Sequence, residues 1–175
     1  NYFATKVSER WEKDIHEVVR QIPKWSETTF LANHIDTSKI GVFGHSQGGS
    51  AVGQVLIDNP KITAGINIDG VQWGTMVDTS LNKPFLLISS DWADDHPDFN
   101  KIAYHKSGSN NFYLAEIKNS GHSNFMDIPF MVNLPLLNES GKINPTKAIR
   151  ITSELVVKFF NKYLNNVETD LVKLS

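Results

Sequence analysis

The chain has 175 residues, of which 40% are hydrophobic, and its 17 Lys and Arg against 19 Asp and Glu leave a formal net charge of −2. This size and apolar content suit one domain with a substantial core rather than a disordered chain, and the near-neutral charge without basic blocks argues against a nucleic-acid partner. No apolar run approaches the roughly 20 residues of a transmembrane segment, and a cysteine count of 0 excludes disulfides, thiolate metal sites and a cysteine nucleophile.

The first predicted element is an amphipathic helix over residues 7–22. Apolar residues recur in this segment at spacings of three and four, the period of a helix with one buried face. These residues are Val7, Trp11, Ile15, Val18, Val19 and Ile22. Because proline lacks the N–H that a helix interior needs, we expect Pro23 to end this helix.

Four short segments rich in β-branched and aromatic residues are interpreted as strands. They are Ile40–Phe43, Ala64–Ile68, Phe85–Ser89 and Phe112–Ile117. Helices are expected at residues 46–58, about 98–105 and 146–164, and a loop is expected at about 131–145. Strands that alternate with helices favour an α/β fold, here about four parallel strands flanked by helices.

The first predicted strand, Ile40–Phe43, is almost entirely apolar. Such a strand is normally covered on both faces and paired on both edges, yet nothing strand-like precedes it. We therefore expect residues 1–175 to form a single partial domain, the C-terminal part of a larger sheet whose N-terminal strands are missing. The missing segment, from the same or another chain, is the expected partner of this edge.

A G-x-S-x-G motif, Gly44-His45-Ser46-Gln47-Gly48, lies between the first predicted strand and the next helix. This placement is typical of a nucleophile elbow, a tight turn that holds its serine in a strained conformation with the hydroxyl exposed. Gly44 and Gly48 are explained by backbones that pass close together. The backbone N–H of Gln47, at the start of the helix, would point toward a developing oxyanion.

A serine nucleophile needs a base, and in this topology the partners follow in the order serine, acid, histidine. His122 comes just after the last predicted strand, in a loop at the same end of the sheet as the motif, and is the predicted base. His96, in an acidic loop after the third strand, is the alternative. The other histidines lie in predicted helices, before the serine or beside it in the motif.

The acid could follow either the second or the third predicted strand. Asp69 follows the second, and Asp91, Asp94 and Asp95 follow the third. Strand periodicity does not choose between them. A carboxylate among the apolar neighbours of Asp69 would be costly to bury unless it is paired, whereas the later three resemble a solvated loop. The cost of burial therefore favours Asp69.

The run from Ile40 to about Phe125 resembles the catalytic half of the α/β-hydrolase fold. More narrowly, it is similar to platelet-activating-factor acetylhydrolase-like and dienelactone-hydrolase-like serine esterases. The segments Gly44–Gly49, Gly65–Gly70 and Gly121–Phe125 carry this resemblance, and Val157–Leu164 looks like the closing helix of bacterial members.

In the acetylhydrolase group the acid follows the strand after the elbow, so the resemblance implies Ser46 as nucleophile, Asp69 as acid and His122 as base. The first strands of the family, and the loop that gives the second oxyanion donor, have no counterpart in this sequence. That departure agrees with the expectation of missing N-terminal strands.

Two aromatic residues are weaker candidates for a substrate pocket, Trp73 and Phe125, since aromatic side chains near a site are about as often core packing. An acidic cluster could suggest a metal, but it is interpreted as a solvated helix start, so neither a metal nor a cofactor is predicted. The cluster comprises Asp91, Asp94, Asp95, His96 and Asp98.

These features predict a serine esterase that hydrolyses a small-molecule carboxylic ester, with a short acyl chain, through an acyl-enzyme on Ser46. Thioester or amide hydrolysis on the same three residues is the alternative within enzymes. A non-catalytic fragment or binding module of the same fold is the alternative outside them.

Overall fold

A computed structural model describes residues 2–72, 79–91, 100, 111–132 and 139–171. Four strands form one sheet: β1 (Ile40–His45), β2 (Ile62–Ile68), β3 (Phe85–Ser90) and β4 (Phe112–Ile117). They lie in the order β1-β2-β3-β4, and every neighbouring pair is parallel. The predicted α/β fold with four parallel strands is thus confirmed.

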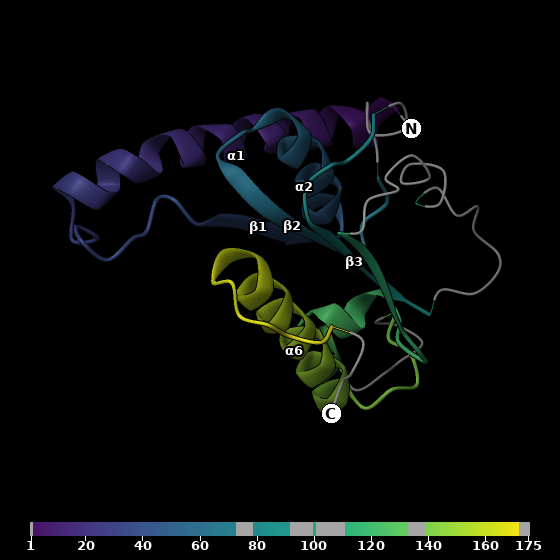
Figure 1. The fold of residues 1–175 in the computed structure, drawn as a ribbon. Coiled ribbons are helices and arrows are strands. Elements are labelled where there is room, and N and C mark those ends of the chain that lie inside the picture. The colour runs from purple at the N-terminus through teal and green to yellow at the C-terminus, as the bar shows by residue number, and fades with distance from the viewer. Residues whose placement is uncertain (1, 73–78, 92–99, 101–110, 133–138, 172–175) are drawn as a thin grey trace.

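Helices cover both faces of this sheet (Figure 1). On one face, α2 (Gln47–Asp58) packs against β1 and β2, and α1 (Tyr2–Thr28) packs on α2. On the other face lies α6 (Pro145–Leu164), near the short helices η2 (His122–Phe125) and α4 (Ile128–Met131). The helix expected at about 98–105 lies, apart from residue 100, outside the described residues, as do residues 133–138 of the expected loop.

The first helix, α1, is longer than predicted and continues through Pro23, so the expectation that this proline ends it is wrong. A proline inside a helix removes one hydrogen bond and crowds one carbonyl, a local cost of about 3 kcal/mol. In the turn after Pro23, hydroxyl groups also donate to carbonyls of the helix. The Ser26 hydroxyl donates to the carbonyl of Pro23 at 2.7 Å, and the Thr28 hydroxyl to that of Lys24 at 2.8 Å.

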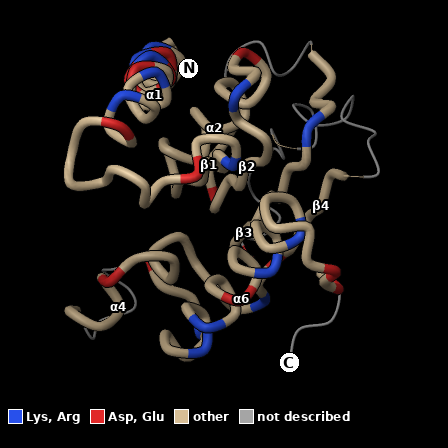
Figure 2. The backbone as a smooth tube through the Cα atoms, turned by 60° about the vertical axis from the view of Figure 1, so that its left-hand side comes forward, with Lys and Arg blue, Asp and Glu red and all other residues tan. Residues whose placement is uncertain are grey.

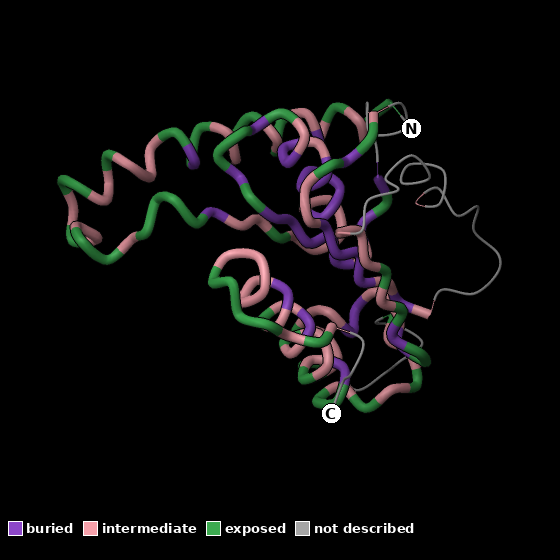
Figure 3. Tube along the Cα trace, viewed as in Figure 1, coloured by how far each residue is buried: buried purple, intermediate pink, exposed green. Residues whose placement is uncertain are grey.

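The apolar core forms two clusters, one on each face of the sheet (Figure 3). Successive residues of β3 belong to different clusters, since Phe85 and Leu87 face α2 whereas Leu86 and Ile88 face α6. A strand covered on both faces is continuously apolar for this reason. The central strands are therefore rigid supports for whatever lies at their carboxyl ends.

The strand β1 lies at the edge of the sheet and is only partly covered. Phe43 is 59% exposed, although its register partner on β2, Ile66, is fully buried. Beside β1 runs a groove of about 450 Å³ between this strand and α1, lined by apolar side chains that include Trp11, Val18 and Val42. In the described part of the chain, apolar surface and an unpaired strand edge thus lie side by side.

Charged residues of both signs alternate along α1 (Figure 2). Lys6 pairs with Glu9, and Arg20 with Glu17, each at 2.7 Å. Exposed pairs of this kind stabilise a helix by only a few tenths of a kcal/mol, roughly 0.2–0.5 each. None of the described helices is long and apolar enough to cross a membrane.

Candidate active site

Ser46 lies at the junction of β1 and α2 with φ 55° and ψ −123°. A positive φ is unfavourable for a residue with a side chain, and it persists only where surrounding contacts fix the backbone. The Ser46 N–H donates to the carbonyl of Ile68 at 2.9 Å, and its carbonyl accepts from the Ser50 N–H at 3.1 Å. The strained turn that the motif predicts is therefore present.

The two glycines of the motif are required for different reasons. A Cβ on Gly44 would lie 2.5 Å from the carbonyl carbon of Gly48, which is backbone and cannot move aside. A Cβ on Gly48 would instead meet the ring of Trp11 on α1 at 3.2 Å. Close passage of backbones thus explains Gly44, whereas Gly48 leaves room for a side chain of α1.

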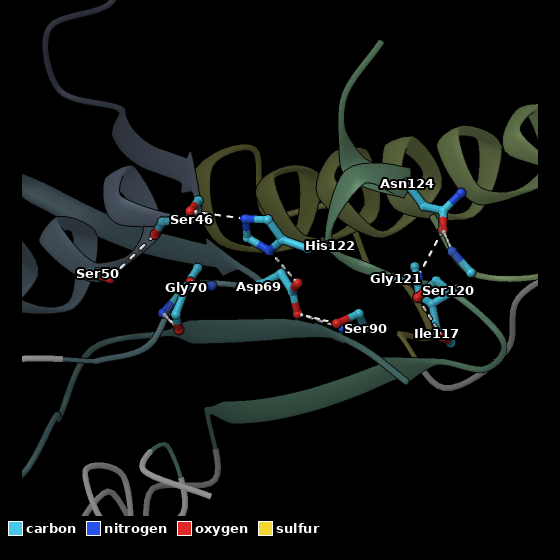
Figure 4. A network of polar contacts seen from close by, with 12 residues as sticks. Ser46, Ser50, Asp69, Gly70, Ser90, Ile117, Ser120, Gly121, His122 and Asn124 are labelled. Carbon is cyan, nitrogen blue, oxygen red and sulfur yellow. Dashed lines mark hydrogen bonds and ion pairs between the residues drawn. The ribbon is translucent and has the colours of Figure 1, made fainter. Parts of the chain in front are cut away.

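Three side chains meet at the carboxyl ends of the strands (Figure 4). Nε2 of His122 lies 3.0 Å from Oγ of Ser46, and Nδ1 of His122 lies 2.7 Å from Oδ2 of Asp69. Ser46 follows β1, Asp69 follows β2, and His122 begins η2 after β4. Parallel strands bring their carboxyl ends to one edge of the sheet, which is why residues far apart in sequence form this chain of contacts.

The carboxylate of Asp69 is held from two sides. Its Oδ1 accepts hydrogen bonds from both the N–H and the hydroxyl of Ser90, each at 2.7 Å, which leaves Oδ2 for His122. Burial raises the pKa of Asp69, but the hydrogen bonds from His122 and Ser90 outweigh it, so the pKa is lowered. Asp69 is therefore an ionised acceptor with a fixed orientation.

Ser90 has a place in the site that sequence reasoning missed. It ends β3, and the register that pairs Ile68 with Ile88 brings the end of β3 beside Asp69. The available signal was the pair of serines, Ser89 and Ser90, at the end of an otherwise apolar strand.

The alternative acid Asp91 does not contact the ring of His122. Its Oδ2 accepts the N–H of Asn119 at 2.7 Å, and its own N–H donates to the carbonyl of Ser120 at 3.1 Å. Asp91 thus supports the loop before His122. Asp94 and Asp95, together with His96 and Asp98, lie outside the described residues.

Asn124 connects the loop before His122 to the segment before α6 through hydrogen bonds. The Oδ1 of this buried residue accepts from the N–H groups of Gly121 and Gly141, at 2.8 and 2.7 Å. Two chain segments are therefore joined next to His122, which restricts the position of its backbone.

His45, inside the motif, packs its ring on that of His122. The ring centroids lie 4.5 Å apart at 35°, and the centroid of the Phe125 ring lies 6.0 Å from that of His45. Burial, and next the charge that His122 can carry, lower the pKa of His45, although Asp69 and the His122 main chain act in the opposite direction. His45 is thus a neutral wall of the site. Of the two predicted pocket aromatics, Phe125 lies against this wall and Trp73 lies outside the described residues.

One group of described residues has the composition of a metal site, namely Glu12, His16 and Asp58, whose ligand atoms lie within 4.8 Å of one another. The Asn59 Oδ1 accepts from the Lys61 N–H, so its Nδ2 donates to Nδ1 of His16 at 2.9 Å. In the neutral ring the proton is then on Nε2, which faces Glu12 at 3.5 Å. A metal ion placed between these residues would meet the Nε2–H of His16 rather than a nitrogen lone pair that could bind it.

The two carboxylates of the group also interact with each other. Burial, and next a hydrogen bond with Asp58, raise the pKa of Glu12. Burial and the neighbouring Asp58 carboxylate thus disfavour the charged form of Glu12, the form that would bind a cation. We do not assign a metal to this group.

Comparisons with known proteins give a family and relatives for this chain. A family model described as platelet-activating factor acetylhydrolase, isoform II, matches residues 14–173. A platelet-activating factor acetylhydrolase of Gallus gallus is 29% identical over 158 residues, which are 85% of this chain and 37% of the relative. That of Cavia porcellus is 28% identical over 139 residues, 77% of this chain and 32% of the relative. The chain spans about a third of the length of these curated relatives.

Solved structures show the same fold. A ferulic acid esterase from Streptomyces cinnamoneus superposes with a TM-score of 0.79 at 22% identity, over 98% of this chain and 53% of the esterase. An acylaminoacyl peptidase from Pyrococcus horikoshii superposes with a TM-score of 0.64 at 21% identity, over 98% of this chain and 31% of the peptidase. The sheet and its helices thus have the α/β-hydrolase fold.

Proposed function

The chain belongs to the platelet-activating factor acetylhydrolase isoform II family, and on this premise we propose that it is a serine esterase acting on carboxylic esters of small molecules. The observation that carries the proposal is the continuous series of contacts from Ser46 through His122 to Asp69, at 3.0 and 2.7 Å. Nucleophile, base and acid are the roles that fit these three residues in that order.

In the proposed mechanism, the Ser46 hydroxyl donates its proton to Nε2 of His122 as Oγ attacks the ester carbonyl. Asp69 holds the His122 Nδ1–H, which keeps Nε2 free to accept the proton, and it stabilises the imidazolium that forms. The tetrahedral intermediate then releases the alcohol, which takes the proton from His122. Water attacks the acyl-enzyme by the same route, the acid leaves, and Ser46 regains its proton.

The negative oxygen of each tetrahedral intermediate needs hydrogen-bond donors. Gln47 is the first residue of α2, where backbone N–H groups have no partner within the helix. We assign one oxyanion contact to the Gln47 N–H, assisted by the positive end of the helix dipole. No step of this mechanism requires a metal or a cofactor.

For the substrate we propose an ester with a short acyl group. The names of the Gallus and Cavia relatives specify an acetyl group, and both align with this chain over most of its length. A thioesterase or amidase on the same residues is the alternative, because the acylaminoacyl peptidase shares the fold.

A fluorophosphonate probe tests the proposed function on the full-length chain, by which we mean residues 1–175 together with the N-terminal segment expected to complete the sheet. We expect a single labelled residue, Ser46, because only a serine with an adjacent base attacks phosphorus readily. Peptide mapping by mass spectrometry locates the label. A chain that stays unlabelled would instead support a non-catalytic module.

A panel of p-nitrophenyl esters, thioesters and anilides of matched acyl chains then ranks the enzyme alternatives, with acetyl and other short esters expected to turn over fastest.

We also propose that residues 1–175 are one partial domain, completed at β1 by an N-terminal segment of the same or another chain. The proposal is supported by the apolar groove beside β1, by the exposed Phe43, and by relatives about three times as long as the matched part. Such a segment would pair the free edge of β1 and bring the second oxyanion donor.

Residues 1–175 expressed alone are therefore expected to aggregate and to be nearly inactive, because an exposed apolar edge associates and a missing donor costs about 100- to 1,000-fold in turnover. Sedimentation velocity and ester hydrolysis measure both properties. Adding the preceding segment, in cis or in trans, should restore them. A soluble, monomeric and fully active chain of residues 1–175 would contradict the proposal.

A further inference from the structure

The side chain of Gln47 does not point into solvent but reaches across to α1. Its Nε2 donates to the carbonyl of Ala4 at 3.1 Å and to the hydroxyl of Ser8, which is 6% exposed. One turn further along α1, the ring of Trp11 lies against Gly48. Ala4, Ser8 and Trp11 are spaced by four and three residues, so one face of α1 contacts the first turn of α2.

The orientation of the peptide between Ser46 and Gln47 decides where the Gln47 N–H points. On the Ser46 side, this peptide is held by the bond from the Ser50 N–H to the Ser46 carbonyl and by the packing of Gly70 against that carbonyl. On the Gln47 side, the long-range hydrogen bonds among the described residues are those from the Gln47 side chain to Ala4 and Ser8 of α1. A strained turn keeps its conformation only when its surroundings fix it.

The contact with α1 is not needed to pack the two helices together. Apolar side chains already do so further along α1, where Val19 is buried against Val52, Val55 and Leu56 of α2, and Ile15 adds to this cluster. The polar contact stands apart from that cluster and involves the residue that carries the proposed oxyanion donor.

We propose that Ser8 and the Gln47 side chain form a positioning pair through which α1 aims the Gln47 N–H at the oxyanion. This inference rests on the proposed esterase function and adds a role for α1 to it. Ser8 touches no reacting atom and acts only through Gln47.

Replacing Ser8 with alanine in the full-length chain removes one acceptor of the Gln47 amide. We expect kcat/KM for a p-nitrophenyl ester to fall about tenfold, less than the 100-fold or more for complete loss of a donor, because the N–H is misaimed rather than absent. Gln47→Met keeps the side-chain length without the amide and should lower kcat/KM by a similar factor. The double variant should be no worse than Gln47→Met alone, because Gln47→Met already removes the contact with Ser8 together with the bond to the Ala4 carbonyl.

A transition-state mimic separates positioning from general damage. A trifluoromethyl ketone forms a tetrahedral oxyanion with the serine, so its affinity should fall by the same factor as kcat/KM in Ser8→Ala. An ether analogue of the substrate has no carbonyl, so its affinity should not change. Ser26→Ala is the matched control on α1, since that hydroxyl bonds only within the helix, to Pro23, and wild-type values are expected.

The inference is overturned if Ser8→Ala keeps wild-type kcat/KM, if mimic and ether affinities change together, or if the effects of Ser8→Ala and Gln47→Met multiply. Gln47→Met leaves Ser8 intact and provides the same readouts where Ser8→Ala does not fold. A failure of the proposed function itself has a different signature, because Ser46→Ala would then retain turnover.

Discussion

Ester turnover by the full-length chain is expected to fall by on the order of a million-fold when Ser46 is replaced by alanine. Nε2 of His122 then has no hydroxyl at 3.0 Å from which to accept a proton, and no acyl-enzyme can form. The turnover that remains would come from substrate binding and the oxyanion donors. Initial rates with p-nitrophenyl acetate, corrected for the uncatalysed rate, measure the effect.

This substitution should leave the fold intact, because one half-buried hydroxyl is removed and the backbone bonds of Ser46 to Ile68 and Ser50 remain. Equal urea midpoints for the variant and wild type would show that. Ser50→Ala is the control one turn into α2, since its hydroxyl contacts the carbonyls of Val71 and Ser46 and does not face His122. We expect it to keep turnover within tenfold. Turnover of Ser46→Ala within tenfold of wild type would rule out the mechanism.

Asp69→Asn is expected to lower turnover by about 1,000- to 10,000-fold. The backbone N–H of Ser90 can only donate, so the amide oxygen of the new asparagine must take the place of Oδ1. Its NH₂ group then takes the place of Oδ2 and donates to Nδ1 of His122. The ring is forced to carry its proton on Nε2, which can no longer accept the proton of Ser46.

The matched control is Asp91→Asn. The Asp91 carboxylate accepts the N–H of Asn119, a bond that an asparagine oxygen can keep, so turnover should change only slightly. Asp94→Asn, three residues further along the chain, should also have a small effect. Steady-state kinetics of the three variants rank them, and a larger loss for Asp91→Asn or Asp94→Asn would move the acid to that loop.

Much of the fold followed from local patterns in the sequence. The four strands and the helices at residues 47–58 and 145–164 agree with the predicted segments to within a few residues, because β-branched runs and helical spacing reflect contacts between near neighbours. The prediction that Pro23 ends the first helix was wrong because it too considered only near neighbours. Its local effect is unfavourable, but the rest of a long helix, packed on α2, outweighs it.

The sequence by itself also determined the position of the serine, since a G-x-S-x-G between a strand and a helix admits one local geometry. It determined that His122 and the acid lie at the same edge of the sheet, because parallel strands share their carboxyl ends. Their catalytic roles stay predictions. Only the tertiary structure decided that the carboxylate in contact with His122 belongs to Asp69, since both candidate loops end at that edge and the choice depends on side-chain direction.

The contacts of Ser90 with Asp69, of His45 with His122 and of Gln47 with Ser8 were likewise decided by the tertiary structure. Each joins side chains from different elements, at distances set by strand register and helix packing. Local sequence patterns describe which face of an element is apolar. They do not describe which polar side chains two elements bring within 3 Å of each other, because that depends on the path of the whole chain.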